Sequence, residues 1–113
     1  MQTLFYSQTI KFTDNNTKGY RPCAFEITEE YLAFKKGSLL GNSIGGLIGL
    51  AMSASADMKN DIILIPIREI TSVEAKKTLL TALVTVHSMN RPVYTFACSS
   101  KKEMETINNL LKR

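Results

Sequence analysis

Side chains that could do catalytic chemistry are few and far apart in this sequence. His87 is the only histidine, and Cys23 and Cys98 are the only two cysteines. A zinc site needs ligands at short spacings such as CxxC or HExxH, and no such spacing occurs. Nucleophilic catalysis by a thiol needs a nearby base, whereas both cysteines lie among alternating apolar residues. We therefore expect no catalytic residue, no metal site and no cofactor, two buried free thiols, and an exposed or hydrogen-bonded strand residue at His87.

Two other patterns resemble part of a catalytic site or of a nucleotide-binding site, but the neighbouring residues that such a site needs are missing. Glu29 and Glu30 are adjacent carboxylates, but they lie where a polar hairpin turn is expected, in full solvent. Residues 41–46, GNSIGG, are rich in glycine but lack the Lys-Ser or Lys-Thr that follows a phosphate-binding loop. The sequence therefore favours a polar turn and disfavours nucleotide binding.

Paired lysines are the main candidates for binding an anion. Lys35 and Lys36 end one expected strand, and Lys76 and Lys77 end another. Contacts of such lysines with phosphate are charge-assisted and sensitive to salt. The alternative is that they are solvated and guard strand edges against unwanted pairing. The net charge of +4 is spread along the chain, so we expect no nucleic-acid partner.

One segment differs from the rest of the chain in composition. Five of the six glycines fall between Gly37 and Gly49, and residues 37–56 carry no charge. If this segment is helical, small residues recur every four positions and would let another backbone approach closely. Internal glycines cost about 1 kcal/mol each relative to alanine in a helix, so such a helix would need a packing partner. The residues that we single out in it are Gly41, Ile44, Gly45, Leu47, Ile48 and Gly49.

Three environments remain open for this uncharged segment. It can be a loop or helix packed against its own domain, a surface for self-association, or a membrane contact. A span of ~20 residues is long enough to cross a bilayer, but a single crossing would separate residues 1–36 from 57–113 and split the domain. A bend at Gly45-Gly46, or a helix lying in the interface, would keep both halves together, with Lys35, Lys36 and Lys59 facing anionic headgroups.

The remaining sequence predicts short strands followed by one helix. Alternating apolar residues indicate strands over 3–12, 22–28 and 31–35, and a buried strand with a kink or bulge over 62–73. Two further strands are expected at 80–87 and 93–98, with Leu80, Ala82, Val84 and Val86 on one face and a turn at 90–92. Ser100 and Glu103 form a capping box that begins an amphipathic helix with Met104 and Ile107.

Six or seven antiparallel strands must bury an apolar face, so we expect a barrel or two packed sheets with the helix covering an open end. We expect one domain over 1–113, with a Gly-rich apolar insertion at 37–57 between the third and fourth strands and a capping helix at 100–113. The N-terminus lacks the features of a secretory signal, which predicts a cytoplasmic protein.

The strand pattern resembles the pleckstrin-homology superfold, and specifically its GRAM-like and bacterial branches. Residues 25–35, FEITEEYLAFK, are similar to a hairpin of that group, and residues 65–74, IPIREITSVE, are similar to its "iPl-x-x-I-x-x-V" strand. The resemblance covers residues 24–36 and 61–113 and implies a barrel capped by the C-terminal helix. The uncharged insertion departs from the generic pattern.

The resemblance and the residues together predict a non-enzymatic binding module. One hypothesis is peripheral association with anionic lipid on the inner face of the membrane, through the insertion and the lysine pairs. The alternative is a protein-interaction or homo-oligomeric scaffold that uses the glycine stripe.

Overall fold

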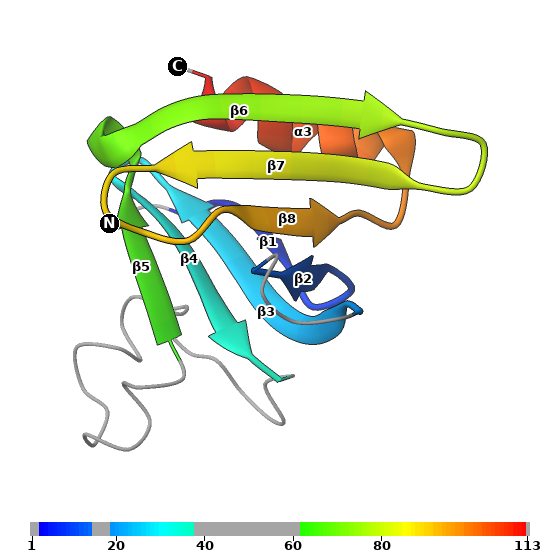
Figure 1. The fold of residues 1–113 in the computed structure, drawn as a ribbon, viewed down its shortest axis with the longest axis horizontal. Helices are drawn as coiled ribbons and strands as arrows, with labels where there is room; N and C mark the ends of the chain where they lie inside the picture. Colours follow the sequence, from blue (N-terminus) through cyan, green and yellow to red (C-terminus); the bar gives the residue numbers. More distant parts are fainter. Residues whose placement is uncertain (1–2, 15–18, 38–61, 113) are drawn as a thin grey trace.

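The computed structural model describes residues 3–14, 19–37 and 62–112, which form eight strands, one short 3-10 turn and one helix (Figure 1). The six residues singled out in the uncharged segment (Gly41, Ile44, Gly45, Leu47, Ile48 and Gly49) lie outside the described residues. The elements are β1 (Thr3–Ser7), β2 (Lys11–Thr13), β3 (Arg21–Thr28), β4 (Tyr31–Lys36), β5 (Ile62–Pro66), η1 (Ile67–Glu69), β6 (Ile70–Lys77), β7 (Ala82–Ser88), β8 (Tyr94–Ala97) and α3 (Lys101–Leu111).

The strands pair in the order β5-β4-β3-β2-β8-β7-β6, and β1 also pairs with β3. All of these strand pairs are antiparallel. Figure 1 shows β3, β4 and β5 running steeply across the nearly horizontal β6, β7 and β8, with α3 packed behind β6 and β7. The expectation of a mainly antiparallel β fold with one C-terminal helix is confirmed.

The strand count exceeds the six or seven predicted because two expected strands are each broken in two. The strand expected over 3–12 is interrupted after Ser7, and this changes which side chains face the core. Phe5, rather than Leu4 or Tyr6, packs against the buried cluster, with its ring centroid 6.0 Å from that of Phe25. The parity predicted for this stretch therefore holds only for its second half, where Ile10 and Phe12 are buried.

The second break lies between β5 and β6, where we expected one kinked strand. After Pro66 the chain makes the 3-10 turn η1, and β5 and β6 then lie at opposite ends of the strand order. Two hydrogen bonds hold this turn: the Ile67 amide donates to the Glu30 carbonyl at 2.8 Å, and the Met89 amide donates to the Glu69 carbonyl at 3.0 Å. These tertiary contacts convert the predicted kink into a corner.

An aromatic cluster fills the space between the crossing strands. Phe34 lies at the centre, with its ring centroid 5.0 Å from that of Tyr94 and 5.1 Å from that of Phe96. Edge-to-face pairs of this kind add to the free energy gained from area burial. The helix contributes Met104, Ile107 and Leu111 to the same buried cluster, as its amphipathic spacing predicted.

The capping box at the start of α3 is present, with one change. The Ser100 hydroxyl accepts a hydrogen bond from the Glu103 amide at 3.1 Å, as expected. The Glu103 carboxylate reaches back to the Ser99 amide at 3.0 Å and to the Ser99 hydroxyl, rather than to the Ser100 amide. Ser100 thus caps the first turn as expected, and Glu103 binds the residue before the cap instead of Ser100 itself.

Candidate functional site

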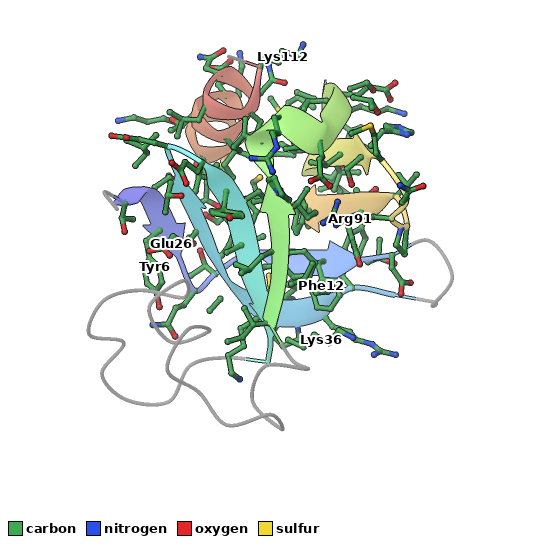
Figure 2. The ribbon with its side chains drawn as sticks, turned by 90° about the vertical axis from the view of Figure 1, so that its left-hand side faces the viewer. Tyr6, Phe12, Glu26, Lys36, Arg91 and Lys112 are labelled. Carbon is green, nitrogen blue, oxygen red and sulfur yellow. The ribbon has the colours of Figure 1, made fainter. Side chains whose placement is uncertain are left out.

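Lys35 and Lys36 lie at the end of β4, beside the root of the uncharged insertion. Lys36 is exposed and Lys35 half-buried, and the Lys35 ammonium donates a hydrogen bond to the Lys36 carbonyl at 3.3 Å. Figure 2 shows Lys36 at the end of the molecule away from α3 and Lys112. Among the described residues neither lysine forms an ion pair, so both charges are available to an external anion.

The strands on either side of the insertion are direct neighbours. β4 and β5 pair along their length, and Lys35 is opposite Ile62 in the register. Gly37 closes β4 with a φ of +81°, and its amide donates to the Pro22 carbonyl at 3.0 Å. A positive φ suits glycine, which has no Cβ to clash. The chain therefore leaves the sheet at Gly37 and re-enters it at the adjacent strand.

Lys76 and Lys77 lie elsewhere, at the end of β6 where the β6–β7 hairpin projects from the body of the protein (Figure 1). Both are exposed, and neither forms an ion pair within the described part of the chain. The Lys77 ammonium donates to the carbonyl of Thr78. The hairpin lies far from the end of β4 in Figure 1, so the four lysines predicted to bind an anion lie in two separate places.

The tip of the β6–β7 hairpin carries a feature that the sequence pattern missed. Leu79 and Leu80 are 95% and 91% exposed, although Leu80 was expected on the buried face with Ala82. The hairpin closes earlier than predicted: the Thr78 amide donates to the Thr81 carbonyl at 2.8 Å, so the two leucines occupy the turn. The adjacent lysines and the polar Thr78 and Thr81 could have indicated a turn at this position.

The two thiols are unsuited to nucleophilic chemistry. Cys23 is buried, and burial raises the pKa of its thiol to about 12. Cys98 is half-buried rather than buried, and burial followed by the charge of Glu103 raises its pKa to about 12 as well. Because the thiolate is the reactive form, neither thiol is activated at neutral pH. Both are free cysteines, as predicted.

The other polar candidates are dispersed. Glu29 and Glu30 are exposed in the turn between β3 and β4, as expected. His87 is half-buried on β7, and its carbonyl accepts a hydrogen bond from the Thr71 hydroxyl at 3.2 Å. Within residues 3–14, 19–37 and 62–112, no three His, Cys, Asp or Glu side chains gather as metal ligands would. The helix in this same part of the chain is too short to cross a membrane.

One open hollow of about 400 Å³ lies between the start of β6 and the end of α3. Its lining mixes apolar side chains with hydroxyls and one lysine: Ile67, Ile70, Thr71, Ser72, Val73, Leu111 and Lys112. None of the predicted site residues lines it. β6 has a strand neighbour on one side alone among the described strands, which leaves its other edge beside the helix.

Comparisons with known proteins agree with this architecture. No family model matches the sequence, and no curated protein matches it. Among solved structures, the chain is similar to the PH domain from TgAPH, with a TM-score of 0.55 and 17% identity over 93% of this chain and 78% of that one. It is also similar to the PH domain from PfAPH, with a TM-score of 0.53 and 21% identity over 94% of this chain and 78% of that one. The chain thus has a pleckstrin-homology-like fold, and its placement in the GRAM-like or bacterial branches stays a prediction.

Proposed function

We propose that this protein is a non-enzymatic binding module that associates peripherally with anionic membrane surfaces. The PH-like fold supports a lipid- or protein-binding role in general. The pairing of β4 with β5 supports the membrane as partner, because it keeps both ends of the uncharged insertion at one edge of the sheet. An apolar segment rooted in this way can enter an interface without separating the two halves of the fold.

The lysines at the root of the insertion supply the electrostatic part of the proposal. Lys35 and Lys36 immediately precede the uncharged residues, so they would lie at headgroup level when the segment contacts the bilayer. Each lysine near an anionic surface contributes about 1 kcal/mol, and the contribution falls with ionic strength. Membrane binding should therefore need anionic lipid and weaken with salt.

Co-sedimentation with vesicles tests this proposal. We expect the protein to bind vesicles of phosphatidylcholine with phosphatidylserine at low salt, and to bind pure phosphatidylcholine much less. Replacing Lys35 and Lys36 with glutamine, or Ile44 and Ile48 with serine, should weaken binding. A matched double variant, Arg68→Gln with Lys112→Gln, removes two exposed charges elsewhere and should bind more tightly than the Lys35/Lys36 variant. Absence of binding to anionic vesicles at low salt contradicts membrane association.

A protein-interaction or homo-oligomeric scaffold is the second candidate, based on the stripe of glycines in the insertion. It predicts that Gly45→Leu changes the molar mass measured by light scattering, because a bulky residue would block close approach of two backbones. An unchanged monomer mass in wild type and variant contradicts it.

A further inference from the structure

The tip of the β6–β7 hairpin, residues 78–81, places two leucines where the fold makes no use of them. Leu79 and Leu80 are the two most exposed large apolar side chains among the described residues, well above Met89 at 49% and Tyr20 at 42%. Neither belongs to a buried cluster. Exposed apolar side chains that lie together can mark a contact site, so we ask what this pair contacts.

Turn chemistry gives no reason for leucine at these positions. Two-residue hairpin turns favour Gly, Asn or Asp, because the turn types that match strand twist need a positive φ at the first central residue. Asn90 is the one non-glycine residue with positive φ in the described part of the chain, so both leucines have negative φ. The threonines hold the turn instead: the Thr81 amide donates to the Thr78 hydroxyl at 3.0 Å.

The charges behind the tip are basic. From Ala75 to Val86 the only charged residues are Lys76 and Lys77, and both are exposed. The start of α3 lies at the same end of the molecule (Figure 1), because the Cys98 amide donates to the Ala82 carbonyl at 2.8 Å. This brings the exposed Lys101 and Lys102 to the base of the hairpin.

Acidic groups near this end are set back from the tip or engaged. Glu74 lies further down β6 and is exposed. Glu103 accepts hydrogen bonds from Ser99. Glu105 lies 3.8 Å from the Lys101 ammonium. The outermost part of the hairpin therefore presents an apolar point followed by cations alone.

We propose that Leu79 and Leu80 insert into the apolar boundary of an anionic bilayer while Lys76 and Lys77 contact its headgroups. Leu79 lies three positions after Lys76, a distance of ~10 Å at the strand rise, and interfacial segments bury their apolar face ~5–10 Å deep. At this spacing, the leucines can lie at the acyl boundary while the lysines lie among the phosphates.

A membrane suits this surface better than a protein. A projecting tip of two side chains is far smaller than the ~800 Å² that each partner buries in a stable protein complex. A lipid interface accepts such a point without a complementary pocket, and its negative charge complements the lysines. This inference rests on the proposed membrane association but names a contact separate from the insertion, since the hairpin and the end of β4 lie far apart in Figure 1.

The absence of tryptophan from the sequence allows a direct test. Leu80→Trp introduces a single fluorescent reporter at the tip, and Met89→Trp places one at the opposite end of β7 as a control. With vesicles of phosphatidylcholine and phosphatidylserine, we expect a blue shift and quenching by brominated acyl chains for Leu80→Trp and neither for Met89→Trp. No shift at Leu80→Trp, or a shift at Met89→Trp instead, overturns the inference.

A loss-of-contact variant separates this inference from the proposed function. The double substitution Leu79→Ser with Leu80→Ser should weaken vesicle partitioning at least about tenfold, and Lys76→Gln with Lys77→Gln should weaken it roughly fivefold for each lysine. If wild type binds anionic vesicles and the serine variant binds equally well, the hairpin inference fails while membrane association stands. If wild type itself does not bind, both fail. If the serine variant instead changes the molar mass in solution, the tip contacts a second copy and the inference is overturned.

Discussion

The two turns at the ends of β7 each connect adjacent antiparallel strands, but different kinds of residue form them. The β7–β8 turn uses residues that suit a reversal of the chain: Asn90 has a φ of 59°, and Pro92 follows shortly after. Arg91 joins this turn to η1, with its guanidinium 2.5 Å from the Glu69 carboxylate and 3.3 Å from the Met89 carbonyl. The β6–β7 turn has two exposed leucines, and the hydrogen bonds that its residues 78–81 make with the described part of the chain stay within the hairpin.

The difference separates residues that serve the fold from residues that do not. At the β7–β8 turn each polar residue has a partner or a conformational reason, so a change there should alter the free energy of unfolding. At the β6–β7 turn the exposed leucines have an unfavourable hydration free energy and do not pack in a buried cluster. Changes there should not lower the free energy of unfolding and should alter what the protein contacts. The predictions below test this contrast between the two turns.

Asn90→Val should give the largest loss of stability. Asparagine tolerates the left-handed region, whereas a β-branched residue at positive φ is strained, and the cost is about 1–2 kcal/mol. Urea unfolding followed by circular dichroism measures it. Asn90→Gly keeps the conformation accessible and is the matched control, with a change of a few tenths of a kcal/mol. Equal losses in both variants would show that the asparagine side chain, rather than the backbone angle, matters.

Arg91→Ala should destabilise the protein because it removes the ion pair with Glu69. The loss should be only about 1 kcal/mol, because the pair is partly exposed and solvent screens it. A double-mutant cycle with Glu69→Ala isolates the coupling between the two side chains. The coupling should shrink as salt is added. A coupling near zero at low salt would mean that the contact of Arg91 with the Met89 carbonyl accounts for the effect.

Elements governed by short-range chemistry could be predicted from the sequence. The hairpin of β3 and β4 follows from alternation around Glu29 and Glu30, and α3 follows from Ser100, Glu103 and the spacing of Met104 and Ile107. In these cases the residues that determine the structure lie within one or two turns of chain. The buried face of β7 was also predicted correctly from Ala82 onward.

Features set by tertiary contacts could not be predicted in the same way. The break after Ser7 changes the phase of β1, and the corner at η1 depends on hydrogen bonds to Glu30 and Met89, which are distant in sequence. Leu80 continues the parity of Ala82, so a pattern of alternation cannot tell where the strand begins; the hydrogen bond between Thr78 and Thr81 decides this. The grouping of lysines likewise depends on where β4 and β6 end in space.

The smallest expected effect on stability, and of opposite sign, belongs to Leu79→Asn with Leu80→Gly. Asn-Gly is the preferred pair for a two-residue hairpin turn and allows the positive φ values that match strand twist. We expect the free energy of unfolding to rise by about 0.5 kcal/mol, within the range of other local-optimisation substitutions, while binding to anionic vesicles falls.

Thermal and urea unfolding, measured beside vesicle co-sedimentation, check both halves of this expectation. Replacing Met89 with asparagine in the other turn is the control for removing an exposed apolar residue without touching the tip, and it should leave vesicle binding unchanged. A loss of stability in the Asn-Gly variant would show that the leucines support the fold after all. The two turns would then differ in how their side chains pack, and the leucines would not be evidence of a function.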